Sequence, residues 1–387
     1  MLLTFAATVL LIRRPVRSIN AGDNGNLFLD LCAPVALPSS KTPELASKGT
    51  ADADFQEILK LNATLSDDTW RKKFEKPHEG QERPKYSNKG GNVDEIQKLR
   101  WDGWNKAEDE LEKEKESKVT IKKAAIYGFC ETDRQQVSAL LQPIAEKDTA
   151  AFLQLTSGAS ADSKLTANAV KKLLEAAYSR GVTQLSELTL DKLKANNGNP
   201  GTRTLFCVAD TPETTKAKTL AALLYCICAA ESTDGSGNFK ECADDIPAAQ
   251  STHADLANAD TDTTAIINTC PDSPSMEITA SEILTSLAAF LGRGTPKQGK
   301  IIFCQLASQG CAGQSSSGLC IVYKTAAKAG TTALTAAEWR TKLVEAAELI
   351  AEQKRRNNKI TKTTSRLADL REQAFNLQPQ LQLHKKI

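Results

Sequence analysis

The sequence predicts a mostly α-helical protein, an elongated helical bundle with a disulfide-rich lobe inserted between its long helices. Residues 335–378 contain neither proline nor glycine, so they can run as one helix of about 60 Å. Residues 94–118 interleave Glu and Lys at helical separations, which favours a second long, solvated helix. Eight of the ten cysteines fall between Cys207 and Cys320, among polar loops that cannot hold their shape alone.

Composition argues against two classes of protein. The 387 residues carry 49 Lys+Arg against 47 Asp+Glu, with both signs interleaved. Binding to nucleic acid is therefore not expected, although Trp101 and Trp104 in a Lys-rich stretch are the candidate stacking platform. No apolar run reaches the roughly 18 residues of a membrane-spanning helix. The length allows roughly two domains.

The N-terminus predicts secretion. An apolar run at residues 2–12 precedes Ala21, a small residue of the kind that signal peptidase accepts. We therefore predict a signal peptide at residues 1–21. Three arginines follow the apolar run instead of preceding it, so an uncleaved or defective leader is the alternative.

The cysteines support this compartment, because an even number in a secreted chain indicates a disulfide framework. All ten are predicted to pair: Cys32, Cys130, Cys207, Cys226, Cys228, Cys242, Cys270, Cys304, Cys311 and Cys320. Metal binding is the alternative, but no C-x2-C pair occurs and the three histidines lie far apart, so no metal is predicted. Cys226 and Cys228 on one helix point about 200° apart and need different partners. The connectivity stays open, since ten cysteines allow about 945 pairings.

Two amphipathic segments are expected near the N-terminus. Apolar side chains at residues 27–32 share one helical face, and Pro34 and Pro38 are expected to end that helix. The second segment covers about residues 52–75. It contains the N-glycosylation sequon Asn62-Ala63-Thr64, for which the alternative is an unused sequon in a helix.

Three helices are expected in the middle of the chain. One covers about residues 165–180 and stops at Gly181. The next begins with Thr211 as N-cap and contains Cys226 and Cys228. The third follows a capping box from Thr279 to Glu282.

Two β-rich stretches, residues 300–304 and 319–323, are expected to pair as a short ribbon joined by a serine-rich loop.

The terminal helix is expected to open at a capping box from Thr335 to Glu338. Its predicted seam is Trp339, Leu343, Ala346, Ile350, Gln353, Asn357, Ile360, Thr364, Leu367, Arg371 and Ala374. Such a long helix needs another beside it, and residues 94–118 and about 133–155 are the available partners.

No catalytic residue or cofactor is predicted. The sequence has no HExxH, Walker loop, GxGxxG after a strand or GxSxG elbow. His78, His253 and His384 lie in separate polar segments and are expected to be solvated. Enzymatic activity is therefore not expected.

Several stretches occur in an order typical of one family. They are residues 21–24 with Phe28 and Cys32, residues 61–67 before Trp70, the C-x-C helix at 223–228 followed by Cys242, residues 283–290, the serine loop ahead of Cys320, and the helix opened by Trp339. In these stretches, over essentially the whole chain after residue 21, the sequence resembles the N-terminal domain of trypanosome variant surface glycoproteins of the B type.

The resemblance implies a core of three long antiparallel helices over residues 22–378, with disulfide-rich top and bottom lobes that contain short β-strands and an insertion at about 200–330. It also implies a homodimer, or a higher homo-oligomer, formed through the bundle, and a GPI anchor at the external side of the plasma membrane. The implied function is a coat that shields the cell and presents variable loops to host antibodies for immune evasion. Some members carry an O-linked hexose in the top lobe. The matching residues are Ser315, Ser316 and Ser317, of which Ser317 is preferred, and the alternative is an unmodified turn.

The chain departs from the family at its C-terminus. Residues 379–387 form a polar tail in which no GPI signal can be read, so we expect a shortened form, an incomplete gene copy or a secreted form. The alternative function is a receptor of the same fold for a host serum protein such as transferrin or haemoglobin. Such a receptor needs an exposed apolar patch on its distal loops. The polar loops of this chain favour shielding.

Overall fold

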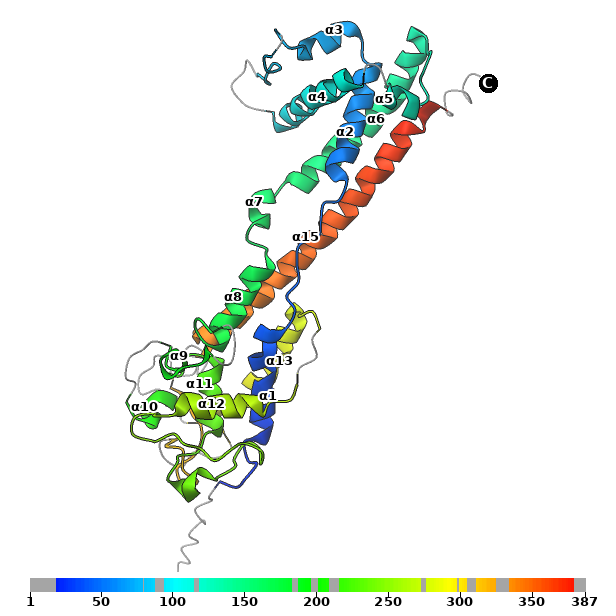
Figure 1. Cartoon of the computed structure of the whole chain (residues 1–387). Coiled ribbons are helices and arrows are strands. Elements are labelled where there is room, and N and C mark those ends of the chain that lie inside the picture. Colours follow the sequence, from blue (N-terminus) through cyan, green and yellow to red (C-terminus); the bar gives the residue numbers. More distant parts are fainter. Residues whose placement is uncertain are drawn as a thin grey trace, which may run out of the picture. The chain divides into compact units, whose positions relative to one another are not determined.

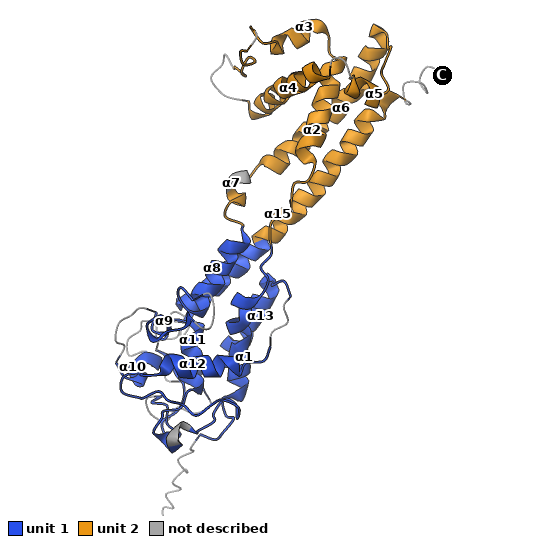
Figure 2. Ribbon diagram, in the orientation of Figure 1, with its two compact units in different colours: residues 1–43, 166–351 blue, residues 44–165, 352–387 orange. Residues whose placement is uncertain are grey.

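The computed structural model describes residues 19–78, 80–87, 94–114, 118–182, 187–195, 201–208, 216–272, 276–297, 299–304, 311–324 and 334–378. Within them the predicted mostly α-helical fold is confirmed, with one small sheet (Figure 1). The chain divides into two compact units (Figure 2). Unit 1 comprises residues 1–43 and 166–351, and unit 2 comprises residues 44–165 and 352–387.

The helices of unit 1 are α1 (Gly25–Ala36), η1 (Leu37–Ser39), α8 (Ala167–Tyr178), α9 (Leu190–Leu193), α10 (Arg203–Cys207), α11 (Leu220–Cys228), η4 (Asp234–Gly237), α12 (Ala259–Asn268) and α13 (Ala280–Gly292). Those of unit 2 are α2 (Ala51–Leu65), α3 (Asp68–Arg71), η2 (Lys72–Phe74), α4 (Glu95–Lys113), α5 (Val119–Lys123), α6 (Glu131–Thr156) and α7 (Ala159–Asp162). Helix α15 (Glu338–Phe375) runs through both units.

Unit 2 is built around α2, α6 and the second part of α15. Ile58, Leu141 and Leu370, one from each helix, share a buried apolar cluster. In a second cluster the rings of Phe55 and Phe152 stack with their centroids 4.1 Å apart. Helix α6 is therefore a partner of the terminal helix, as residues 133–155 predicted, while α4 packs on α2 and α6.

Unit 1 has its core around α11. All nine residues of α11 are buried, and the helix contacts α1 and α12 while α13 packs on α1. Trp339, at the start of α15, is 1% exposed and donates its indole N–H to the Tyr323 hydroxyl at 2.9 Å. Because α11 is buried on all sides, its sequence is apolar throughout and has no polar face.

The predicted ribbon is present with one strand more. Strands β2 (Lys300–Phe303) and β3 (Ile321–Lys324) are antiparallel with Phe303 opposite Ile321. Strand β1 (Thr295–Lys297), which was not predicted, pairs with the other side of β2. It is exposed along its length and contains Pro296, which explains why no alternating pattern marks it.

Two predicted helix boundaries near the N-terminus are wrong. Helix α1 continues through Pro34 to Ala36, because the packing of its buried face outweighs one missing backbone bond. The segment 52–75 is not one helix. It breaks at Ser66, after which the Asp67 side chain accepts from the Trp70 backbone N–H at 2.8 Å and starts α3.

Of the three predicted helix starts that follow, one is confirmed and the other two helices begin at other residues. The capping box from Thr279 to Glu282 is confirmed. Helix α11 begins after Thr219, whose hydroxyl accepts from the Ala222 N–H, and Thr211 lies outside the described residues. Helix α15 begins at Glu338 itself, so Thr335 is not its N-cap. The Glu338 carboxylate instead accepts from Arg180 at 2.8 Å.

The seam of α15 is predicted correctly up to Gln353, and beyond it at Ile360, Leu367 and Ala374. Beyond it, the buried residues are Arg356, Ile360, Thr363, Leu367, Leu370 and Ala374. The expected Asn357, Thr364 and Arg371 are partly exposed. At these three positions the buried residue is the one before the predicted residue, namely Arg356, Thr363 and Leu370.

Candidate functional site

Four disulfides form the covalent framework of unit 1. They are Cys32–Cys270, Cys207–Cys226, Cys228–Cys242 and Cys304–Cys320, with Cα–Cα distances of 5.5, 5.6, 5.3 and 4.9 Å. Cys226 and Cys228 thus bond to two different partners, as their helical spacing requires. Two of the disulfides, through Cys226 and Cys228, attach other segments to the fully buried helix α11, which fixes segments that bury little surface themselves.

The expectation that all ten cysteines pair does not match the structure. Cys130 is exposed and free, and Cys311 is buried and free. They belong to different units, Cys130 to unit 2 and Cys311 to unit 1. An even count predicts complete pairing only if each leftover cysteine finds another within about 7 Å between Cα atoms.

A serine turn at residues 313–318 is held by backbone bonds across its base. The Gly313 N–H donates to the Gly318 carbonyl at 3.1 Å, and the Gly318 N–H donates to the Gln314 carbonyl at 2.8 Å. Gly313 has a φ of +92°, and a Cβ there would lie 2.8 Å from the Arg203 Nε. Only glycine fits this position without displacing Arg203.

The Arg203 side chain packs against Gly313 of the turn. This side chain is 1% exposed, and its Nη2 donates to the Tyr225 and Cys226 carbonyls in the last turn of α11, each at 3.1 Å. A cation there complements the negative end of the helix. The guanidinium also lies over the Tyr225 ring, 4.5 Å from its centroid.

Two acidic side chains accept hydrogen bonds from residues of the turn. Asp234 accepts from the Ser315 N–H at 2.5 Å, and Glu231 accepts from the Gln314 amide at 3.0 Å. Hydrogen bonds, above all from Thr233, lower the pKa of Glu231 against the opposing effect of burial. No local pattern in the sequence signals these long-range contacts.

The three candidate serines differ in accessibility. Ser316 is exposed, whereas Ser315 and Ser317 are half-buried. The Ser317 hydroxyl accepts from the Gln314 N–H at 3.3 Å, and the Ser315 hydroxyl contacts Asp234 at 3.4 Å. Ser316 is therefore the most exposed of the three serines.

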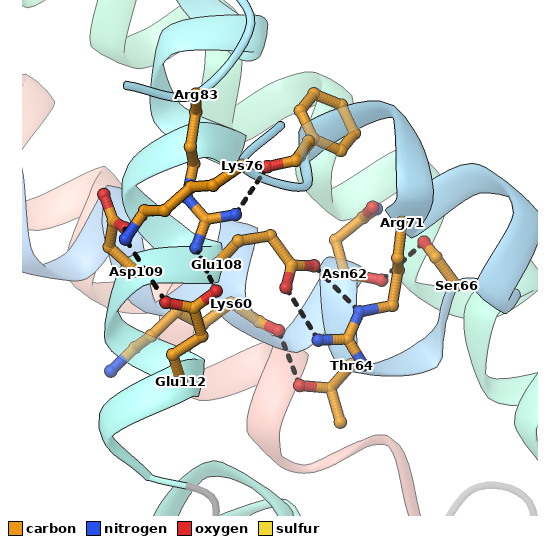
Figure 3. Close-up of polar contacts among 11 residues, drawn as sticks. Lys60, Asn62, Thr64, Ser66, Arg71, Lys76, Arg83, Glu108, Asp109 and Glu112 are labelled. Carbon is orange, nitrogen blue, oxygen red and sulfur yellow. Dashed lines mark hydrogen bonds and ion pairs between the residues drawn. The ribbon is translucent and has the colours of Figure 1, made fainter. Parts of the chain in front are cut away.

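The sequon lies in the last two turns of α2 (Figure 3). Asn62 is partly exposed. The Thr64 hydroxyl donates to the Lys60 carbonyl at 2.8 Å, and the Ser66 hydroxyl donates to the Asn62 carbonyl at 2.9 Å. In the folded helix the Thr64 hydroxyl is thus engaged in a hydrogen bond to the backbone.

Charged side chains around the sequon are paired with one another (Figure 3). Arg71 makes two hydrogen bonds to Glu108, at 2.8 and 2.7 Å, and Arg83 bridges Asp109 and Glu112 at 3.0 and 2.7 Å. Burial alone would raise the pKa of Asp109, but hydrogen bonds from Lys76 and Arg83 outweigh it and lower that pKa.

The tryptophans proposed as a stacking platform are part of the fold. Trp101 and Trp104 form one aromatic cluster with Trp70, Phe74 and Tyr86. Trp101 donates its indole N–H to the Pro84 carbonyl at 2.7 Å. Packing of residues 70–86 onto α4 accounts for these side chains.

The histidines lie apart. His78 is exposed, His253 is partly buried with its Nδ1 3.2 Å from the Ala312 carbonyl, and His384 lies outside the described residues. His253 is therefore only partly solvated, because its ring contacts the backbone just before the serine turn. The described residues contain no cluster of three His, Cys, Asp or Glu side chains suited to a metal ion.

The fold and these sites define a helical, disulfide-stapled protein that displays a braced polar turn. Among the described helices, none combines the length and the apolar character needed to cross a bilayer. The family model described as the trypanosomal VSG domain matches residues 6–369, and the chain belongs to this family. Variant surface glycoprotein ILTAT 1.23 of Trypanosoma brucei brucei is 32% identical over 387 residues, covering 99% of this chain and 73% of that protein.

Proposed function

We propose that the chain is a trypanosome surface coat glycoprotein that shields the cell and presents variable loops to host antibodies. The observation that carries this proposal is the similarity over nearly the whole chain to a variant surface glycoprotein. The braced serine turn agrees with it, because a fixed polar turn is a suitable antigenic surface. A role as a structural coat requires no catalytic centre.

The finer features follow from the family. We propose a homodimer formed through the helical bundle, residues 1–21 as the signal peptide, and attachment by a GPI anchor to the external side of the plasma membrane. The four disulfides support a secretory route.

Two modifications are proposed. Asn62 carries the N-glycan, and the serine turn carries the O-linked hexose, on Ser316 in preference to the Ser317 expected from the sequence, because Ser316 is exposed. Intact mass after N-glycosidase treatment tests both sites. We expect one hexose to remain, and Ser316→Ala to remove it while Ser317→Ala retains it. A hexose that survives Ser316→Ala contradicts this assignment.

The coat role is tested on living, non-permeabilised trypanosomes that express the chain as their dominant surface protein. Antibodies against the folded chain should stain the whole surface, and antibodies against invariant surface proteins should bind poorly until the chain is depleted. Staining confined to the cell interior would contradict the proposal. Capture of one host serum protein at nanomolar Kd would support the receptor alternative instead.

A further inference from the structure

Cys320 lies beside two other cysteines, Cys304 and Cys311. Strands β2 and β3 pair Phe303 with Ile321, so the next position along this ladder sets Cys304 opposite Cys320. These two cysteines form the observed disulfide, with a Cα–Cα distance of 4.9 Å. This pairing closes a loop that includes the serine turn.

The serine turn brings a second cysteine close to Cys320. The base of the turn is closed by the hydrogen bond from the Gly313 N–H to the Gly318 carbonyl at 3.1 Å. Cys311 lies two residues before Gly313 and Cys320 two residues after Gly318, so each arm of the turn carries one cysteine.

The packing of the side chains places the three cysteines together. Cys311 and Cys320 are 1% and 0% exposed and form one buried cluster with Val322, against which Cys304 packs. Cys311 is a free thiol. Three sulfur atoms thus gather at the base of one turn, two of them bonded and one free.

We propose that Cys311 exchanges with the Cys304–Cys320 disulfide, so that the serine turn exists in two covalent isomers. The Cys311 thiolate attacks the Cys320 sulfur, the Cys311–Cys320 bond forms, and Cys304 leaves as a thiolate that takes up a proton. The numbers of thiols and disulfides do not change, so the step needs no oxidant or reductant. This proposal stands on its own geometry and does not depend on the coat function.

The exchange has a defined consequence for the turn. In the observed isomer the turn is tied to the end of β2, whereas in the second isomer it is closed on itself by Cys311 and Cys320. Burial raises the pKa of the Cys311 thiol to about 12, opposed by Arg203 and Lys300 and assisted by Glu241. Exchange therefore proceeds slowly at neutral pH, through local opening of the cluster.

The wild-type protein tests the exchange directly. The secreted protein is incubated at pH 8.5, quenched with acid, alkylated with N-ethylmaleimide and mapped. Trypsin leaves the three cysteines on one peptide, residues 301–324, so chymotrypsin is needed to cut at Leu306 and Leu319. We expect the label on Cys304 to grow as the label on Cys311 falls, with a constant sum. Label that stays on Cys311 alone overturns the proposal.

A variant tests the alternative pairing without exchange. Cys304→Ser should carry one label in denaturant, on Cys130, because Cys311 and Cys320 pair with each other. Three labels, on Cys130, Cys311 and Cys320, overturn the proposal. Cys228→Ser is the matched control, and three labels are expected for it, on Cys130, Cys311 and Cys242. If circular dichroism shows that Cys304→Ser does not fold, the wild-type measurement decides.

Discussion

Asp148 in α6 is a carboxyl buried without a compensating partner. The side chain is 0% exposed, and neither oxygen has a hydrogen-bond partner in the part of the chain that the structure describes. Burial raises its pKa to about 8, and the charge of nearby Asp54 adds to this effect. Asp54 itself is held by Arg371 at 3.3 Å and by the Thr50 hydroxyl at 2.7 Å. The native protein therefore keeps Asp148 protonated near neutral pH.

This burial predicts the direction of a pH effect. Between about pH 4 and pH 8 the native state holds a proton on Asp148 that the unfolded state has lost, so the free energy of unfolding falls as pH rises. The slope from this group is at most about 1.4 kcal/mol per pH unit. Urea unfolding followed by helical circular dichroism should show Asp148→Asn gaining stability over wild type at pH 7.5 and little at pH 4. Equal differences at both pH values would contradict the assignment.

The contact between α2 and α4 depends on a glycine. A Cβ on Gly103 would lie 2.3 Å from the Leu59 Cδ1, and the Gly103 carbonyl accepts from the Gln56 amide at 2.9 Å. The Leu59 side chain occupies the space that a side chain at position 103 would need. The apolar pattern of α4 is too sparse to reveal this, since only Gly103, Ala107 and Glu108 of that helix are buried.

A double-mutant cycle checks this contact. Gly103→Ala alone should lower the free energy of unfolding by about 1 to 3 kcal/mol through overpacking. In a Leu59→Ala background the same substitution should be near neutral, because the clashing methyl is gone. Gly292→Ala in α13 is the control, since a Cβ there meets nothing within 4 Å. We expect it to be neutral or stabilising by up to about 1 kcal/mol. Additive effects at Gly103 and Leu59 would contradict the packing argument.

The polar middle of α15 is explained by what it contacts. The Asn357 side chain does not belong to a purely solvated face, because its amide oxygen accepts from the Ala46 N–H at 2.7 Å and its amide nitrogen donates to the Glu44 carbonyl at 2.8 Å. Gln353 donates to the Leu165 carbonyl at 3.0 Å. These side chains satisfy backbone groups of irregular segments that no helix or strand could satisfy.

Arg356 makes the strongest of these contacts. It is 7% exposed, and its guanidinium makes two hydrogen bonds to Asp162, at 2.7 and 2.8 Å, and one to the Leu155 carbonyl, at 2.8 Å. Arg356→Ala should lower the free energy of unfolding by about 3 kcal/mol, since it leaves a partly buried carboxylate unpaired. Arg356→Lys keeps the charge but not the paired geometry and should lose an intermediate amount. A lysine variant as stable as wild type in urea unfolding would contradict the role of the two guanidinium hydrogen bonds to Asp162.

The helices were predictable where one apolar face decides their position, and less so where polar contacts do. Up to Gln353 the seam of α15 follows from spacing alone. After it, Arg356 and Asn357 are both polar, so their pattern cannot show which one is buried. Leu370 was the available signal, because an apolar side chain beside the expected Arg371 indicates the shifted seam.

The residue types that form the candidate site were predictable from the sequence, but the contacts between them were not. The cysteine-rich region and the serine loop could be found by composition, whereas the pairing of Cys32 with Cys270 joins positions 238 residues apart. No local pattern specifies such a contact. For the same reason, the support of the serine turn by Arg203 and Asp234 follows only from the folded chain.

The covalent links are distributed unevenly between the units. All four disulfides lie in unit 1, and Cys130 is the one cysteine of unit 2. A disulfide stabilises by restricting the unfolded chain, typically by about 2 to 4 kcal/mol and more for long loops. Reduction should therefore destabilise unit 1 selectively.

Hydrogen exchange with and without a phosphine reductant measures this effect in each unit. On reduction we expect backbone amides of α11 and α13 to lose protection, because their loops are no longer held and unit 1 opens more often. Amides of α2 and α6 should keep most of their protection, since apolar clusters and ion pairs hold them. Equal loss in α2 and α11 would contradict this prediction and would show that α15, which runs through both units, makes them unfold together.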